Sequence, residues 1–195
     1  MSFYTHGELV AIGFRRLGVG VKISRLASIH NSGAIEIGDE SRLDDFCVLS
    51  AGAGGIFIGR HVHIAVYSSL IGAGRIDIKD YANVSSRVAI YSSNDDYSGR
   101  WMTNPTVPSR LTNVSHAPVC VESHVIIGAG SVILPGVTLA RGAGIGALSL
   151  VRSDCDALGI YVGCPARLVG RRQSKMFELQ RDLDAREQSV PPPLP

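Results

Sequence analysis

The side chains best suited to chemistry gather in one polar segment of the chain, SSNDDYSGRWMTNPTVPSRLTNVSHAP. Asp95 and Asp96 stand near its start, and Tyr97 and Trp101, the only tryptophan, follow them. A carboxylate is a poor base for a hydroxyl, but it can orient a neutral amine and take the proton that the amine sheds. Aspartates also cap turns, and the two aromatic residues could shape a substrate site or pack on a neighbouring subunit. The segment is therefore a candidate functional site, because long loops in compact folds are often functional.

Two of the six histidines, His63 and His116, are candidates for a role in a reaction. His63 could donate a hydrogen bond to a developing oxyanion, and His116, which ends the polar segment, could act as a base that reaches in from an adjacent subunit. An ordinary structural role remains open for both. The four cysteines show no C-x-x-C spacing, so we expect buried free thiols and no metal site.

Small residues recur in the second half of the chain at Gly128-Ala129 and Gly146-Ala147. Backbone can approach a ligand closely only where no side chain intervenes. The same residues would also suit tight corners. A compact turn, Gly163 to Arg167, with the sequence GCPAR, follows them.

These residues are embedded in a repeat with a period of six. From position 121 every sixth residue is aliphatic: Val121, Ile127, Ile133, Leu139, Ile145 and Val151. This spacing fits neither a helix nor an alternating strand. It predicts an all-β solenoid whose coils have three short faces and whose aliphatic residues stack in ladders between parallel coils.

A longer repeat marks the coils. Segments that begin at Ile35, Ile56 and Ile76 align with starts 21 and 20 residues apart, and the pattern resumes at Val119. The chain between about 94 and 117 is thus an excursion from the solenoid. Apolar spacing predicts an N-terminal helix over Leu9 to Leu17 that caps the open end. It also predicts a helix over 174–188 that packs over the last coil. The expected organisation is a cap at 1–20, a solenoid at 21–172 and a helix with a tail at 173–195.

Composition supports one domain, since 195 residues are enough for a substantial core. Charged residues make up 18% of the chain, 22 residues are glycine, and the formal charge is +2, which gives no reason to expect a nucleic-acid or membrane partner. The N-terminal segment is too polar for a signal peptide or a membrane span, so we expect a cytoplasmic protein.

The hexads and the GCPAR turn resemble the hexapeptide-repeat acyltransferases. The resemblance implies a left-handed parallel β-helix and a homotrimer whose active sites lie between subunits. It further implies that acetyl-coenzyme A lies along the late coils, with its pantetheine arm near the backbone of Gly128, Ala129, Gly146 and Ala147. Pro165 and Ala166 would contact the adenine, and Arg167 or Arg171 would face the phosphates.

The stretch VSSRVAIYSSNDDYSG resembles a narrower group, the N-acyltransferases of nucleotide-linked 4-amino-4,6-dideoxyhexoses, as in viosamine and anthrose biosynthesis. Galactoside and maltose acetyltransferases place a histidine where this chain has Asp95, which favours an amine over a hydroxyl as the acceptor. In the narrower group a serine and an aspartate ten residues apart lie near the sugar amine. Ser85 and Asp95 match that pair, and Ser86 and Asp96 share its spacing. The expected substrate is a dTDP-linked aminosugar destined for surface polysaccharide.

Two alternatives remain open at this stage. The first is O-acetylation of a saccharide with His116 or His63 as the base. The second is a solenoid without transferase activity, either a scaffold or a metal-binding protein. Related carbonic anhydrases bind zinc through a His-x-x-x-x-His pairing, which the spacings of His61 and His63 and of His116 and His124 do not match.

Overall fold

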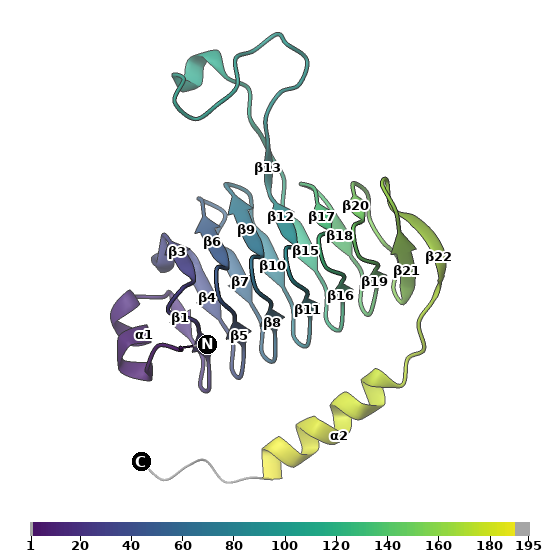
Figure 1. Cartoon of the computed structure of the whole chain (residues 1–195). Coiled ribbons are helices and arrows are strands. Elements are labelled where there is room, and N and C mark those ends of the chain that lie inside the picture. Colours follow the sequence, from purple (N-terminus) through teal and green to yellow (C-terminus); the bar gives the residue numbers. More distant parts are fainter. Residues whose placement is uncertain (1, 190–195) are drawn as a thin grey trace.

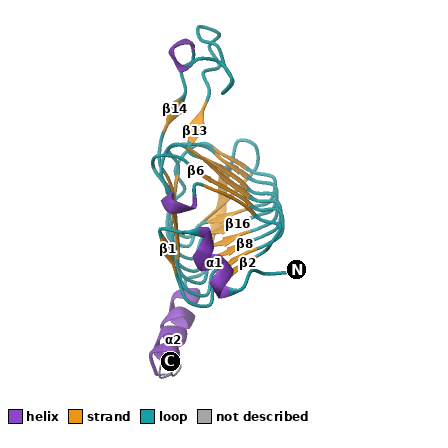
Figure 2. Cartoon of the chain, turned by 90° about the vertical axis from the view of Figure 1, so that its left-hand side faces the viewer, coloured by secondary structure: helices purple, strands orange, loops and turns teal. Residues whose placement is uncertain are grey.

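The computed structural model describes residues 2–189 and shows a left-handed parallel β-helix with three faces. Figure 1 views it from the side, and Figure 2 shows the coils after a quarter turn. Face 1 is the sheet of β1 (Arg16–Leu17), β4 (Ile35–Ile37), β7 (Ile56–Ile58), β10 (Ile76–Ile78), β15 (Val119–Val121) and β18 (Thr138–Leu139). Face 2 contains β2 (Lys22–Ile23), β5 (Arg42–Leu43), β8 (His63–Ile64), β11 (Asn83–Val84), β16 (Ile126–Ile127), β19 (Gly144–Ile145), β21 (Gly159–Val162) and β22 (Arg167–Arg171). Face 3 contains β3 (Ser28–His30), β6 (Val48–Ala51), β9 (Ser69–Gly72), β12 (Ala89–Tyr91), β17 (Val132–Ile133) and β20 (Leu150–Val151).

The predicted hexad ladders form the core. On face 2 the register pairs Val84 with Ile127 and Ile127 with Ile145, so one aliphatic residue stacks on the next from coil to coil. All six residues of the hexad series are buried. Full burial of such a side chain contributes about 1.5–3 kcal/mol each, and the sum over the ladders holds strands of only two to four residues in register.

The corner between faces 1 and 2 carries a column of aromatic side chains. His61, Tyr81 and His124 all adopt left-handed backbone conformations, with φ between 53° and 62°, which bulky residues rarely do. The stacking of their rings offsets the conformational cost of these backbone angles. The ring centroids of His61 and Tyr81 are 5.1 Å apart, and those of Tyr81 and His124 are 5.0 Å apart. We call these three residues the aromatic column.

The C-terminal helix, α2 (Met176–Ser189), runs back along this column, beneath the solenoid in Figure 1. The ring of Phe177 meets His124 edge-on, and Gln180 Oε1 lies 2.7 Å from His124 Nε2. One turn further, Asp184 accepts a 2.5 Å hydrogen bond from the Tyr81 hydroxyl, and Glu187 lies 2.9 Å from His61 Nε2. The helix pitch of about 5.4 Å nearly equals the strand spacing of about 4.8 Å, so each turn of α2 meets one coil. The helix meets the last coil only at its start, where Phe177 lies beside Gly142, and the rest of it lies over earlier coils rather than over the last coil as predicted.

The N-terminal helix is also shorter than predicted. α1 (His6–Ile12) begins with a capping box of Thr5 and Glu8 and ends at Gly13, whose φ is 76°. The chain then enters face 1 at β1, so the solenoid starts before residue 21. Leu9 is buried in the core cluster, which anchors the helix to the first coils.

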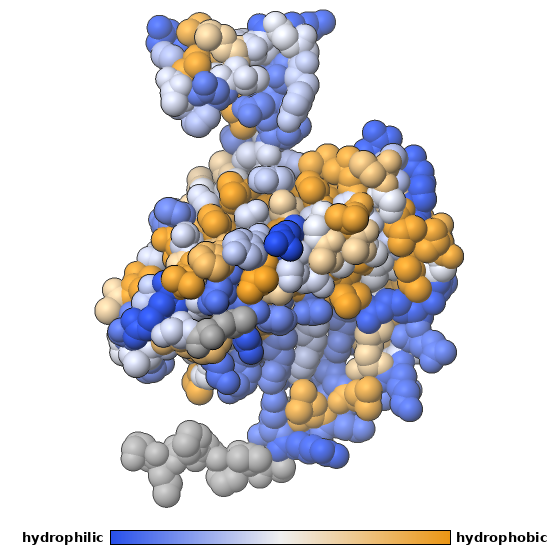
Figure 3. All heavy atoms as spheres, in the orientation of Figure 1, coloured by the Kyte–Doolittle hydropathy of each residue, from blue (hydrophilic) through white to orange (hydrophobic). Residues whose placement is uncertain are grey.

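The excursion is an arm on a narrow stalk. β13 (Ser93–Asn94) and β14 (Ser115–His116) pair antiparallel and, with Asp95, form the stalk. Residues 96–114 form the arm, which includes a short 3₁₀ helix, η2 (Ser109–Leu111). A second 3₁₀ helix, η1 (Ser32–Ala34), lies at the corner between β3 and β4. Figures 1 and 3 show the arm standing clear of the solenoid. Within residues 2–189, no helix is both long and apolar enough to cross a membrane.

Candidate functional site

Small residues line the corner between faces 2 and 3 on successive coils. The N–H of Ser85 donates to Ile127 O at 2.9 Å, and the N–H of Gly128 donates to Ile145 O at 2.7 Å, which places Ser85, Gly128 and Gly146 side by side. Ser86, Ala129 and Ala147 follow them at the next position. We call these six residues the small-residue edge.

Coil stacking itself demands the glycines of this edge. A Cβ on Gly128 would lie 2.5 Å from Ala147 N, and a Cβ on Gly146 would lie 2.6 Å from a methyl group of Val162. Close packing therefore explains the glycines without a ligand. Its result is nevertheless a smooth edge on which Ala129 and Ala147 are exposed, and backbone there is open to an extended ligand.

The GCPAR turn continues this edge at the end of the solenoid. It joins β21 to β22 and contains a cis peptide bond between Cys164 and Pro165. The N–H of Ala166 donates to Leu150 O at 2.8 Å, so Pro165 and Ala166 lie against β20, half-buried. Arg167 and Arg171 are both exposed.

A hollow of 430 Å³ opens where the stalk leaves face 3. It is lined by Tyr91, Ser93, Asn94, Asp95, Tyr97, Val132 and Leu134. Asp95 is exposed, and within the described part of the chain its carboxylate has no hydrogen-bond or ion-pair partner. It is the only charged side chain of this hollow.

Asp96 has a different environment. Its carboxylate accepts hydrogen bonds from the N–H of Ser98 at 2.7 Å, from the Ser98 hydroxyl, and from the Asn113 amide at 3.1 Å. These bonds lower the pKa of Asp96. Asp96 thus shapes the arm as a turn residue, while Asp95 is left available.

No family model matches the chain. Among curated proteins, the dTDP-4-amino-4,6-dideoxy-D-glucose acyltransferase of Escherichia coli is 52% identical over 180 residues, which cover 92% of this chain and 94% of that protein. The chain belongs to this family of hexapeptide-repeat acyltransferases. A crystal structure of AntD, an N-acyltransferase from Bacillus cereus, in complex with dTDP and 3-hydroxybutyryl-CoA superimposes with a TM-score of 0.92 at 42% identity, covering 96% of this chain and 99% of that one. A maltose O-acetyltransferase from Clostridium difficile, 18% identical, shares the fold with a TM-score of 0.58 over 86% of this chain and 75% of that one.

The acyltransferase keeps Ser85 and Asp95 apart within one chain. Ser85 lies at the corner where face 2 turns into face 3, and Asp95 lies on the stalk beyond the other end of the same strand, β12. Ser86 stands beside Ser85, half-buried. Tyr97 lines the hollow and is 87% exposed, whereas Trp101 lies further out on the arm and is also exposed. One subunit therefore brings Asp95 and Tyr97 together but not Asp95 and Ser85.

His63 is held by its neighbours on face 2. Its Nε2 lies 2.9 Å from Asp44 Oδ2, and its Nδ1 lies 3.2 Å from Asn83 Oδ1. Asp44 is only 4% exposed and also accepts a 2.7 Å hydrogen bond from Arg42. Burial acts to raise the pKa of Asp44, but the hydrogen bonds from His63 and Arg42 outweigh it and lower the pKa. With both ring nitrogens engaged, His63 has neither one free to donate to a substrate oxygen.

His116 stands on the stalk with one nitrogen fixed. The Ser93 hydroxyl accepts a hydrogen bond from Ala73 N–H at 2.7 Å and lies 2.8 Å from His116 Nδ1. Because Ser93 already accepts from the backbone, its own proton is free to be donated to Nδ1. Nε2 of this exposed ring is then left for an outside partner.

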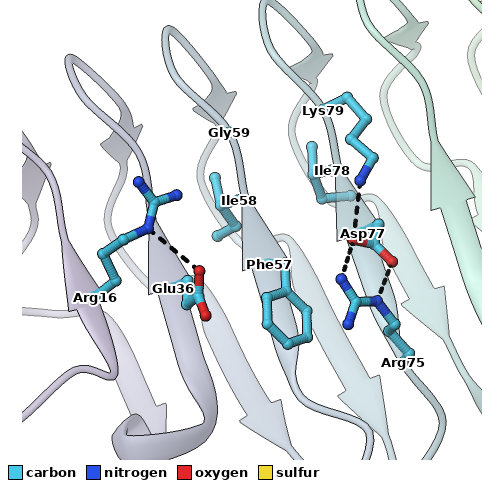
Figure 4. Close-up of a pocket in the computed structure, with 9 residues that line it drawn as sticks. All are labelled: Arg16, Glu36, Phe57, Ile58, Gly59, Arg75, Asp77, Ile78 and Lys79. Carbon is cyan, nitrogen blue, oxygen red and sulfur yellow. Dashed lines mark hydrogen bonds and ion pairs between the residues drawn. The ribbon is translucent and has the colours of Figure 1, made fainter.

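Two other polar groups were not singled out by the sequence. Arg172, next to the predicted Arg171, donates to the carbonyls of His124 at 2.9 Å and Gly142 at 2.8 Å, and burial lowers its pKa. It joins the corners of two successive coils between faces 1 and 2. The hollow of 270 Å³ on face 1 in Figure 4 is occupied by mutual ion pairs, with Asp77 held by Arg75 and Lys79 and Glu36 held by Arg16. Among the described residues, no group of three potential ligands could hold a metal ion.

Proposed function

We propose that this acyltransferase moves an acyl group from coenzyme A to the 4-amino group of dTDP-4-amino-4,6-dideoxyglucose. The near full-length 52% identity to the Escherichia coli enzyme carries the proposal. Crystal structures of the Bacillus cereus N-acyltransferase in complex with dTDP-4-amino-4,6-dideoxyglucose and coenzyme A, at 42% identity and a TM-score of 0.91, support it. Acetyl-coenzyme A is the simplest acyl donor.

Ser85 and Asp95 are the proposed site pair. The Bacillus cereus protein was crystallised with substitutions of one serine and of one aspartate, and the aspartate lies ten positions after the serine. Two pairs in this chain share that spacing, Ser85 with Asp95 and Ser86 with Asp96. The first pair is favoured because Asp96 is engaged within the arm while Asp95 is free.

The proposed reaction needs little from the protein beyond positioning. The Asp95 carboxylate accepts a hydrogen bond from the neutral amine and directs its lone pair at the thioester carbonyl carbon. The new C–N bond forms, the C–S bond breaks, and the proton lost by nitrogen balances the charge of the departing thiolate. The Ser85 hydroxyl and nearby backbone donors stabilise the tetrahedral intermediate. We assign the proton relay to His116 through its Nε2, and we assign His63, which is bonded to Asp44 and Asn83, a structural part on face 2.

A homotrimer would complete the site, since the small-residue edge and the hollow lie at opposite ends of face 3. The hollow of one subunit, with Asp95 and Tyr97, and Trp101 further out on the arm would meet the small-residue edge of its neighbour. The large apolar side chains that the arm leaves exposed, among them Tyr97, Trp101 and Met102, support this arrangement, because a neighbouring subunit could cover them. Acyl-coenzyme A would lie along Gly128, Ala129, Gly146 and Ala147, with its adenine near Pro165 and Ala166 and its phosphates near Arg167 or Arg171.

We further propose a cytoplasmic location and a role in building surface polysaccharide. The cysteines support a cytoplasmic location, because all four are free thiols and such thiols persist in reducing compartments. The acceptor chemistry supports the second, since a nucleotide-linked sugar is an activated donor for glycan assembly.

Free-thiol release with acetyl-coenzyme A tests the reaction. We expect release with dTDP-4-amino-4,6-dideoxyglucose and none with its 4-hydroxy counterpart; release with the hydroxyl sugar alone would refute the N-acyl assignment. Asp95→Asn should lower kcat/KM by roughly 100-fold or more. Asp96→Asn is the matched control, because the asparagine Oδ1 can still accept both hydrogen bonds from Ser98, and it should stay within about threefold of wild type. A reversed result would assign the reaction to Ser86 and Asp96.

Complementation tests the shared site. Ser85→Ala and Asp95→Asn chains should each be inactive alone, but co-expressed chains should recover about a quarter of the wild-type activity, because one interface in four pairs two intact halves. Sedimentation should give three times the 20.7 kDa of one chain. Monomeric active protein, or no recovery on mixing, would contradict the split site.

A further inference from the structure

The hollow at the foot of the arm has one polar side and one apolar side. Asn94 and Asp95 come from the stalk, and the Ser93 hydroxyl there is already engaged with Ala73 and His116. The other side is the outer surface of face 3, where Tyr91, Val132 and Leu134 project. Its one carboxylate therefore lies opposite a hydrocarbon surface.

That apolar side is continuous. The register of β12 and β17 pairs Ala89 with Val132 and Ile90 with Ile133, so Tyr91 and Leu134 stand next to each other on adjacent coils. Neighbouring strands are about 4.8 Å apart, which leaves no gap between these two side chains for a polar group. Val132 and Leu134 project on the same side of β17 because they are two residues apart. All three are half-buried. We call them the apolar wall.

A 4-amino-4,6-dideoxyhexose has the same arrangement of groups. Its amine is on C4, and its C6 methyl group is on the adjacent C5, so the two groups are only a few ångströms apart. A sugar whose amine contacts Asp95 must therefore bring C6 close to the surface of the hollow that faces that carboxylate. A methyl group gains from apolar contact there, whereas a hydroxymethyl group would lose hydrogen bonds to water without replacement.

We propose that the apolar wall receives the C6 methyl group, and that Val132 and Leu134 select 6-deoxy sugars over their 6-hydroxy counterparts. This inference rests on the proposed function and adds a specificity determinant to it. An apolar pocket rejects an added hydroxyl by on the order of 100-fold. The wild-type enzyme should show that ratio of kcat/KM between dTDP-4-amino-4,6-dideoxyglucose and dTDP-4-amino-4-deoxyglucose, which carries the C6 hydroxyl.

Two variants test the wall. Val132→Thr is nearly isosteric and adds one hydroxyl, and it should reduce the ratio to about tenfold or less, as should Leu134→Asn. Val48→Thr is the matched control, because Val48 lies in the same row of face 3, three coils earlier, and outside the hollow. The control should keep the wild-type ratio, and circular dichroism should show all three variants folded.

The outcomes separate the two proposals. Thiol release with neither sugar would overturn the proposed function and this inference together. Release with both sugars at rates within about threefold, or ratios in Val132→Thr and Leu134→Asn that match Val48→Thr, would overturn this inference alone. A change of more than about tenfold in the Kd of dTDP in Val132→Thr, with an unchanged sugar ratio, would also overturn it and would assign the wall to the thymine base.

Discussion

The buried hydroxyl of Ser68 is expected to hold the backbone of the proposed catalytic serine. Ser68 Oγ donates to the carbonyl of Ser85 at 2.8 Å and accepts from the N–H of Val88 at 3.2 Å, and Ser68 is 0% exposed. Ser131 makes the same kind of hydrogen bond on a later coil of this corner, where its hydroxyl donates to Gly146 O at 2.9 Å. A hydroxyl in this position closes the turn that the backbone itself leaves open.

Ser68→Ala removes both bonds without filling or emptying much space. The Ser85 carbonyl and the Val88 N–H would each lose a partner in a place that water does not reach. An unsatisfied buried group costs about 1–3 kcal/mol, so we expect the free energy of unfolding to fall by about 2–4 kcal/mol. For a chain of this length that corresponds to a Tm lower by roughly 4–16 °C.

Urea denaturation at one fixed protein concentration measures this loss, because the stability of the proposed trimer would depend on concentration. Ser69→Ala is the matched control: Ser69 is the next residue, points outward from face 3, and makes no recorded side-chain hydrogen bond within the described residues. It should change the free energy of unfolding by less than about 0.5 kcal/mol. If the two variants unfold at the same urea concentration, the hydrogen bonds of Ser68 do not stabilise the corner and the reasoning fails.

Two further predictions concern titrating groups. Burial raises the pKa of three thiols to about 11, those of Cys47, Cys120 and Cys155, so at pH 8 only about 0.1% of each is thiolate. Iodoacetamide should therefore label only the exposed Cys164 in native protein, and a second adduct in the intact mass would contradict this. Asp44 has a pKa below its ordinary value of 3.8, so its stabilising effect is present above that pH and is lost as the pH falls below it. Asp44→Asn should cost about 2 kcal/mol at pH 7, and the gap to wild type should close on acidification below pH 4; a gap that does not change with pH would count against the ionised contact.

The sequence predicted the solenoid well because its signal is local and periodic. The inward position of each hexad holds an aliphatic side chain, so the core is visible as hexads without any knowledge of the partner coil. The helix ends were less accessible. Apolar residues continue past Ile12, and the true boundaries were the capping box of Thr5 and Glu8 and the left-handed Gly13. The path of α2 could not be predicted, since its partners on the aromatic column are polar side chains rather than an apolar groove.

The candidate site was also predictable from the sequence only in part. Small residues at one corner follow from the six-residue spacing, so the small-residue edge could be anticipated. The difference between Asp95 and Asp96 could not, because it depends on Asn113, which closes the arm from seventeen residues away. The pairing of His63 with Asp44 likewise joins adjacent coils nineteen residues apart, a distance at which no local pattern links the two residues.

The path of α2 changes how the solenoid can come apart. A stack of coils is a one-dimensional system in which each unit touches only its neighbours, so coils at an open end can unravel one at a time. α2 begins beside Gly142 and reaches His61, contacting four successive corners with one continuous helix. The last coil cannot unfold without displacing α2, which also packs on the earlier coils. A segment of fourteen residues thus makes the four coils from His61 to Gly142 open as one cooperative unit.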